Sequence, residues 1–281
     1  MIANHCVDYF KNSKTFLGNI FYSANIKIRH YKPKKEMFFE GKRYILKTAG
    51  NNFELKQALS LRYTIFKKEM LSKKGYFKID IDKFDRHCDH LIIIDKENYK
   101  IIGTYRLNVD MGKVYAKEEF ILKNILNLEG KKLELGRACI LKEYRNGLII
   151  GLLWKGIKNY VDNNNIRYLF GCSSVFTSEI KEALGYYKYF KKNNMVPENL
   201  EVSPTRKYKY KNCKEIYRKY YKLLPLINEN DMPAILRAYI RFGAKICGLP
   251  AFDKEFNCFD FFTLLDYNGI NFKQVNKFDT L

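Results

Sequence analysis

The sequence predicts an α/β fold in which helices flank a mixed sheet. Three observations support this prediction. Segments rich in β-branched and aromatic residues alternate with segments of helical periodicity. Two β-branched runs near the middle of the chain form a hairpin pattern. Before and after this hairpin, helical patterns follow strand patterns along the sequence. No internal repeat or long linker divides the 281 residues. We therefore predict one domain over 43–281, preceded by an N-terminal extension over 1–42.

The first half of the domain contains a strand, a helix and a hairpin. Residues 43–49 form a strand pattern, and an asparagine at position 51 or 52 can cap a helix that continues to about residue 70. A polar loop over 75–90 follows. The two β-branched runs of 90–109 surround a polar turn, which predicts the hairpin.

The second half alternates helices and strands. A helical stretch lies near 116–127. After it we predict a strand over 133–142, a helix over 148–164, a strand over 166–175, a helix over 178–193, a helix over 233–244 that has Pro at its start and Gly near its end, and a last strand near 259–266.

The chain is strongly basic. Its 51 Lys and Arg residues exceed its 30 Asp and Glu residues, for a net charge of +21. Residues 181–222 alone contain 12 Lys or Arg against 4 Glu, interleaved with eight tyrosines. Such a segment suits an anionic membrane, an acidic protein or single-stranded nucleic acid. The alternative is a lysine-rich face that only contacts solvent.

The cysteines and the apolar segments predict a cytoplasmic protein. Seven cysteines form no CxxC pair, and Cys139, Cys172 and Cys247 lie in apolar segments, as reduced core thiols do. The apolar run at 148–154 is far too short to span a bilayer, and the N-terminus lacks the pattern of a signal peptide. We expect a cytoplasmic location, with peripheral binding at the inner membrane face as a further option.

Two charged residues interrupt the predicted strand 133–142. Glu134 and Arg137 alternate there with apolar residues, and a charge inside a central strand is costly unless it is paired or used. A glutamate at such a place can take a proton from an attacking ammonium, which an amine must lose before it can act as a nucleophile. The alternative is a Glu–Arg pair that only organises the sheet.

The turn that follows this strand is a candidate anion site. Arg145, Asn146 and Gly147 lead into a helix N-terminus, where backbone N–H groups and the helix dipole favour an anion. With one glycine the turn suits a single phosphate, such as that of phosphopantetheine, better than the pyrophosphate of coenzyme A. The alternative is a turn that only caps the helix.

The loop over 80–90 is rich in acidic residues and histidines. Its spacing fits no standard zinc or calcium template, so we predict no metal there. An acidic lip that receives a cationic amino acid is the functional alternative, and a solvated loop with aspartate turns is the structural one.

Several motifs in one order resemble the ornithine N-acyltransferase family, also called hemolysin-like, of the GNAT superfamily. The tail over 234–266 resembles that family's C-terminal extension, so the likeness covers about residues 43–267. Ala138 departs from the family, which often has Ser at that position. The motifs are LRYTIFKKEM (61–70), DIDKFD (80–85), CDHLIIID (88–95), IIGTYRL (101–107), ELGRACILKEYRNG (134–147), LLWKGIKNYV (152–161) and YLFGCSS (168–174).

The resemblance, together with a looser one to acyl-homoserine lactone synthases, implies a GNAT-like fold and roles for particular residues. Glu134 would be the base, and Arg137 its neighbour at the thioester. A third group would contact phosphopantetheine, namely Arg145, Asn146 and Gly147. The substrate-side and scaffold residues would be Arg62, Phe66, Asp82, Asp85 and Arg106.

The function that follows is transfer of a fatty or 3-hydroxy fatty acyl group from acyl carrier protein to the α-amine of an amino acid. Ornithine would be the acceptor and a lyso-ornithine lipid the product. The carrier's phosphopantetheine thioester would be a co-substrate, without a bound cofactor. Another amine acceptor, such as glycine, lysine or glutamine, is the alternative within the same enzyme class. A basic nucleic-acid-binding protein would explain the charge, but it leaves Glu134, Arg137 and the ordered motifs unexplained.

Overall fold

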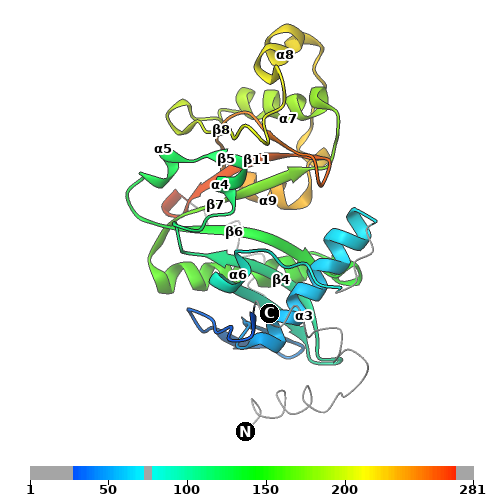
Figure 1. Cartoon of the computed structure of the whole chain (residues 1–281), viewed down its shortest axis with the longest axis vertical. Helices are drawn as coiled ribbons and strands as arrows, with labels where there is room; N and C mark the ends of the chain where they lie inside the picture. The colour runs from blue at the N-terminus through cyan, green and yellow to red at the C-terminus, as the bar shows by residue number, and fades with distance from the viewer. Residues whose placement is uncertain (1–27, 73–77, 270–281) are drawn as a thin grey trace. The chain divides into compact units, whose positions relative to one another are not determined.

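The computed structural model describes residues 28–72 and 78–269, which form two compact units (Figure 1). Unit 1 takes in the described chain up to Leu107 together with Arg137–Tyr160. Unit 2 takes in Asn108–Gly136 and the described chain from Val161 onward. Strand β6 (Lys131–Ile140) is divided, since its first six residues belong to unit 2 and its last four to unit 1.

Unit 1 is built on a sheet whose strands are mostly neighbours in sequence. In hydrogen-bonding order they are β1 (Phe38–Glu40), β2 (Tyr44–Thr48), β3 (Asp89–Asp95), β4 (Lys100–Asn108) and the end of β6. The first four pair antiparallel. β3 and β4 form the predicted hairpin, with an irregularity in register between Ile93 and Ile94.

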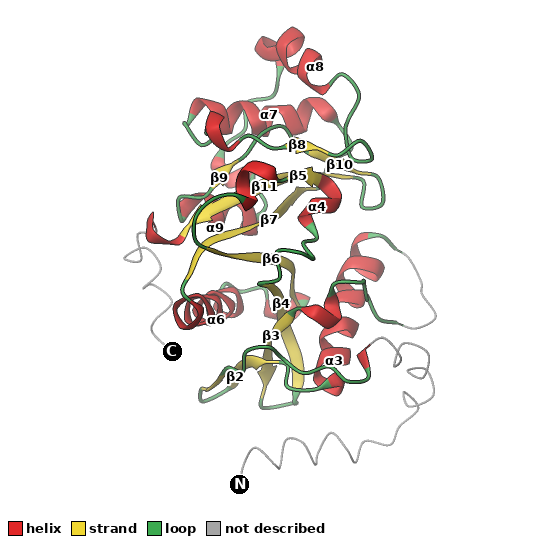
Figure 2. Ribbon diagram, turned by 60° about the vertical axis from the view of Figure 1, so that its left-hand side comes forward, coloured by secondary structure: helices red, strands yellow, loops and turns green. Residues whose placement is uncertain are grey.

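Two long helices cover opposite sides of this sheet. Figure 2 shows α3 (Asn52–Arg62) on one side of β2–β4 and α6 (Leu148–Asn164) on the other. α3 begins where it does because the Asn51 side chain accepts hydrogen bonds from two backbone N–H groups of the first turn, and it continues as a π-helix over Tyr63–Met70. α6 packs closely, since a Cβ at Gly156 would lie 2.8 Å from Leu91.

Unit 2 is centred on β7 (Ile166–Val175). On one side β7 pairs in parallel with β6 over Lys131–Glu134, and on the other it pairs antiparallel with β11 (Cys258–Asp266). β9 (Lys245–Ile246) and β10 (Ala251–Asp253) both pair with β11. Backbone packing within the unit is close enough to require glycine at position 171, where a Cβ would lie 2.3 Å from the carbonyl oxygen of Leu135.

A small sheet and several helices complete unit 2. β5 (Phe120–Ile121) and β8 (Ser203–Pro204) form a small separate sheet. In Figures 1 and 2, α8 (Cys213–Tyr220) lies on the far side of α7 (Ile180–Lys192) from β11. The α-helices of the unit are α4 (Ala116–Glu119), α5 (Lys123–Leu126), α7 (Ile180–Lys192), α8 (Cys213–Tyr220) and α9 (Ala234–Arg241).

The structure confirms the mixed α/β fold, with one correction. The stretch near 116–127 is not one helix, because Phe120 is buried and β5 separates α4 from α5. The boundary at residue 42 stays a prediction, and residues 1–27 of the proposed extension lie outside the described chain. Six described cysteines are free thiols, and no helix among the described residues has the length and apolarity to cross a membrane.

Candidate active site

Unit 1 contains a buried cluster of alternating charges, which we call the arginine–aspartate cluster: Arg62, Arg106 and Arg137 with Asp80, Asp82 and Asp85. Arg62, the last residue of α3, donates from Nε and Nη2 to Oδ2 of Asp80 at 2.9 and 2.7 Å. Its Nη1 donates to Oδ1 of Asp85 at 2.6 Å. Arg106 on β4 donates from Nη1 to Asp82 at 2.6 Å and to Asp85 at 3.0 Å.

The positive and negative charges of the arginine–aspartate cluster offset one another. Burial alone would raise the pKa of Asp85, but the charges of Arg62 and Arg106 outweigh it and hold that pKa well below its usual range. The pKa of Asp82 is lowered in the same way, chiefly by Arg106. His90, whose Nε2 lies 2.9 Å from the Asp85 carbonyl oxygen, is neutral, because burial lowers its pKa to about 4.

The cluster has a buried interior and an accessible edge. The side chains of Arg62 and Asp85 are 1% and 0% exposed, whereas those of Asp82 and Arg137 are 22% and 17% exposed. Arg137 Nη2 donates to Asp82 at 3.3 Å, and its guanidinium lies 5.7 Å from the centre of the Phe66 ring. The backbone of Arg137 is left-handed, with φ of +54°, which is strained for a side chain of this size.

These contacts correct the interpretation of the 80–90 loop as an acidic lip. Asp80, Asp82 and Asp85 are neutralised by arginines of the same cluster. Asp89 is also engaged, because it accepts the Tyr160 hydroxyl at 2.7 Å. The structure does bring together five predicted residues with Arg137 around this loop: Arg62, Phe66, Asp82, Asp85 and Arg106.

Glu134 lies in unit 2, at the end of the parallel pairing of β6 with β7, where it is paired with Phe170. It is 4% exposed. Its Oε1 accepts the Ala116 N–H at 2.7 Å, and its Oε2 accepts the Tyr115 N–H at 3.0 Å and the Asn108 side-chain amide at 3.2 Å. Because two carboxylate oxygens offer about four acceptor positions, these three bonds orient the group and leave one position at Oε1.

The turn before α6 is arranged as the sequence predicts for a helix start. Asn146 Oδ1 accepts the N–H of Leu148 at 3.1 Å, and Gly147 is left-handed with φ of +89°. Arg145 donates to the carbonyl of Ile140 and to Glu69 at 2.9 Å. Both partners of the Arg145–Glu69 pair are partly exposed, and an ion pair of this kind exchanges easily for another anion.

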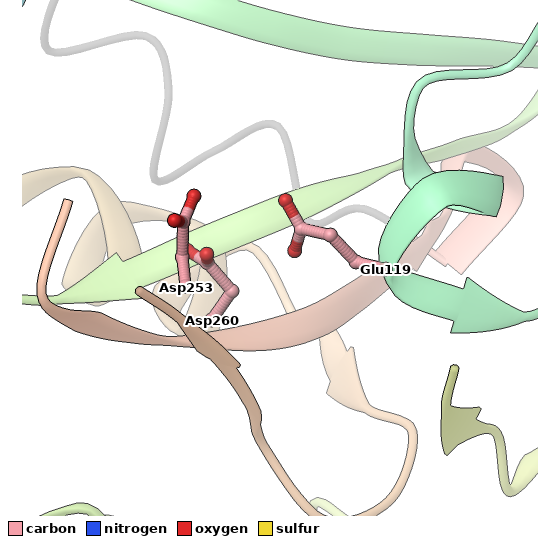
Figure 3. A group of neighbouring side chains, drawn as sticks. All are labelled: Glu119, Asp253 and Asp260. Atoms are coloured by element: carbon pink, nitrogen blue, oxygen red, sulfur yellow. The ribbon is translucent and has the colours of Figure 1, made fainter. Parts of the chain in front are cut away.

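Unit 2 also contains three neighbouring carboxylates that sequence reasoning missed, which we call the carboxylate cluster: Glu119, Asp253 and Asp260. Figure 3 shows the Glu119 side chain directed toward the two aspartates. Their carboxylate oxygens lie within 4.8 Å of one another, and the three residues are 1%, 6% and 4% exposed. The signal was present in the sequence, because Asp253 and Asp260 interrupt apolar strand patterns as Glu134 does.

Comparison with known proteins assigns the family. A model of the Acetyltransferase (GNAT) domain family matches residues 61–155. The L-ornithine N(alpha)-acyltransferase of Rhizobium meliloti (strain 1021) is 30% identical over 249 residues, which cover 80% of each chain. The chain belongs to the L-ornithine N(alpha)-acyltransferase family. The protein of that name from Brucella abortus (strain 2308) is 28% identical, over 83% of this chain and 88% of that one.

Membership of this family makes the chain an acyltransferase and confirms the resemblance drawn from the motifs. Among solved structures, the CoA-dependent acyl-homoserine lactone synthase BjaI with SAM and isopentyl-CoA matches with a TM-score of 0.44 and 11% identity, over 79% of this chain and 82% of that one. The GNAT match at 61–155 includes the arginine–aspartate cluster, Glu119, Glu134 and the turn before α6. Asp253 and Asp260 lie beyond it, in the C-terminal part of the chain.

Proposed function

We propose that this acyltransferase moves a fatty or 3-hydroxy fatty acyl group from acyl carrier protein to the α-amine of ornithine, giving a lyso-ornithine lipid. Four curated relatives named L-ornithine N(alpha)-acyltransferase, at 26–30% identity, support ornithine as the acceptor. The observation that carries the chemistry is Glu134, a buried and fully oriented carboxylate with one acceptor position left.

In the proposed reaction Glu134 takes a proton from the substrate ammonium, directly or through one water. The amine lone pair then attacks the thioester carbonyl carbon, so that a C–N bond forms and the carbonyl oxygen becomes an oxyanion held by backbone N–H groups. When the C–S bond breaks, the phosphopantetheine sulfur leaves as a thiolate and takes the second amine proton. The amide and the free carrier thiol are the products, without a covalent acyl-enzyme.

The remaining predicted residues have three roles in this proposal. Asp82, Arg137 and Phe66 form the accessible edge of the arginine–aspartate cluster, so they are the members available to a substrate. The buried members of the cluster, Arg62, Asp85 and Arg106, hold that edge in place. Arg145, Asn146 and Gly147 would receive the phosphate of phosphopantetheine at the start of α6.

The exposed basic surface before and along α8 supports an acidic carrier and an anionic membrane as partners. Exposed lysines lie at positions 207, 209, 211 and 214. Two leucines beyond α8, Leu223 and Leu226, are 78% and 80% exposed. Lysines attract an acidic protein or anionic headgroups, and exposed leucines next to them suit contact with lipid or an acyl chain.

The tyrosines of the same segment argue against nucleic acid. Base stacking needs exposed rings, but Tyr186 and Tyr187 are buried. Tyr187 packs edge-on against Tyr217 at 5.1 Å, and Tyr210 packs against Phe252 and Phe259. Most of the aromatic residues that suggested a stacking surface therefore form part of the unit 2 core.

The carrier proposal is tested by exchanging Lys207, Lys209, Lys211 and Lys214 for Gln. We expect a higher KM for acyl carrier protein and weaker binding to anionic vesicles, with kcat nearly kept and with both effects reduced by salt. The same assay compares one acyl group on the carrier and on coenzyme A. Equal kcat/KM on the two donors, or unchanged carrier and vesicle binding in the variant, would contradict this part of the proposal.

The chemistry is tested with Glu134→Gln, alongside Glu129→Gln as an exposed control just before β6. We expect a loss of about 10²–10⁴-fold in kcat for Glu134→Gln and no loss for the control. Gln would turn an amide toward N–H donors that now bind a carboxylate, so thermal unfolding must be followed too. A general base predicts that the lost rate recovers as rising pH deprotonates the amine without help.

A purely structural role for Glu134 predicts a lower melting temperature and an equal loss at every pH. Lipid mass spectrometry of cells expressing the wild-type protein completes the test, because it reports the head group and the acyl chain together. An acylated ornithine is expected. Acylated glycine or lysine in place of acylated ornithine would contradict ornithine as the acceptor.

A further inference from the structure

We propose that the carboxylate cluster of Glu119, Asp253 and Asp260 binds the side-chain ammonium of the amino-acid substrate and thereby selects a diamino acid. This inference rests on the proposed function, which supplies a substrate with two amines. It assigns the α-amine to Glu134 and the second amine to a separate site in the same unit.

The two aspartates are oriented by neutral donors. Asp253 Oδ1 accepts the backbone N–H groups of Glu255 and Phe256 at 2.7 and 3.2 Å. Asp260 Oδ1 accepts the Ser174 hydroxyl at 2.5 Å. Neutral donors fix the direction of a carboxylate but do not cancel its charge, so these contacts by themselves do not neutralise the cluster.

One carboxylate oxygen of the cluster lacks a hydrogen-bond partner. This atom is Oε2 of Glu119, which has no partner among the described residues and is buried, since the residue is only 1% exposed. A buried, unsatisfied acceptor destabilises the folded state, and buried like charges add to that cost. Burial, and then the charge of Asp260, raise the pKa of Glu119 well above its usual range. A cation bound between the three carboxylates would satisfy Oε2 and offset the repulsion.

The geometry suits a primary ammonium. An ammonium carries three N–H donors, and bonds of about 2.9 Å in tetrahedral directions place their acceptors roughly 4.7 Å apart. The carboxylate oxygens of the cluster lie within 4.8 Å of one another, which keeps all three within reach of a single ammonium. One oxygen from each of three side chains would then receive one N–H each.

The strand register places this cluster and Glu134 along one face of the unit 2 sheet. On β7, residues 170, 172 and 174 point to the same face. Phe170 is paired with Glu134, and Ser174 is paired with Asp260. Cys172 lies between them, and burial followed by the charges of Glu119, Asp260 and Glu134 raises the pKa of its thiol. The proposal requires ornithine, whose two nitrogens are roughly 6 Å apart when extended, to reach from Glu134 past Cys172 to the carboxylate cluster.

The experiment measures selectivity between ornithine and norvaline, which has the same carbon chain but no second amine. Wild type, Glu119→Gln and Asp253→Asn are assayed with one acyl carrier protein thioester, with Glu118→Gln as the exposed neighbouring control. We expect the wild type to prefer ornithine. In the two cluster variants we expect the KM for ornithine to rise about tenfold or more, and the KM for norvaline to change much less. The control should keep the wild-type preference.

The outcomes separate this inference from the proposed function. A wild type that acylates no ornithine overturns the proposed function and this inference together. A wild type that prefers ornithine, with the preference intact in both cluster variants, overturns only this inference. Equilibrium dialysis with Mg²⁺, Mn²⁺ or Ca²⁺ supplies a second readout that does not depend on activity. A divalent ion bound by the wild type and lost in Glu119→Gln would also overturn it.

Discussion

Each unit contains a cluster of three carboxylates, and the surroundings of the two clusters act on these carboxylates in opposite ways. In the arginine–aspartate cluster of unit 1, arginine charges hold the pKa values of Asp82 and Asp85 below their usual range. In the carboxylate cluster of unit 2, burial and neighbouring aspartates raise the pKa of Glu119. A cluster whose charges are neutralised can stabilise the fold without a ligand. A cluster of carboxylates without a positive charge destabilises the folded state until a cation binds. We infer that the first is mainly scaffold and the second mainly receives substrate.

The largest effect that we expect is a loss of stability when the arginine–aspartate cluster is disrupted. Arg62→Met removes three hydrogen bonds and leaves Asp80 and Asp85 buried without this partner. We expect the free energy of unfolding to fall by about 3–5 kcal/mol, measured by urea denaturation. Arg145→Met, which breaks an exposed pair with Glu69, is the matched control and should cost less than about 1 kcal/mol. Similar losses for the two variants would remove the distinction between scaffold and surface pairs.

The two clusters should also respond to pH with opposite signs. Asp85 has a lowered pKa, so its stabilisation is present above about pH 4 and is lost in acid; His90 adds a loss as pH falls from about 6.5 to about 4. Glu119 has a raised pKa, so its contribution is favourable at low pH and is lost as pH rises above about 4.5.

The variant Glu119→Gln isolates the second effect, because it removes the titration of Glu119 and keeps the shape. The difference in unfolding free energy between this variant and the wild type should increase from pH 4.5 toward neutrality, in favour of the variant. Chemical denaturation at several pH values measures it, with Glu118→Gln as the control. Parallel pH curves for wild type and Glu119→Gln would mean that the carboxylate cluster is not repulsive.

Local patterns predicted most of the fold. The helix cap at Asn51, the β3–β4 hairpin and strand β7 all follow from capping residues or period, which act over a few neighbouring positions. The prediction was wrong at 116–127, because tertiary burial of Phe120 and pairing of β5 with β8 overrode helical periodicity. Such pairing joins residues far apart in sequence, so a local pattern does not contain it.

The site was predicted in part, for a related reason. Arg62, Asp82, Asp85 and Arg106 were proposed as site residues through the family resemblance, but the sequence could not show that the arginines neutralise the aspartates, since contacts between distant segments need coordinates. The strained backbone of Arg137 also has no sequence signal. The carboxylate cluster was missed although Asp253 and Asp260 interrupt apolar strands, because only the fold brings Glu119 to them.

If the carboxylate cluster binds the side-chain ammonium of the substrate, the bound ammonium must change the titration of Glu119. The carboxyl carbon of Glu119 can be followed by ¹³C NMR in protein labelled at glutamate, with Glu119→Gln to assign the signal. We predict that the pKa of Glu119 stands well above its usual range in the free enzyme and falls when ornithine saturates it, while norvaline leaves it unchanged. A pKa that ornithine does not lower would contradict the claim.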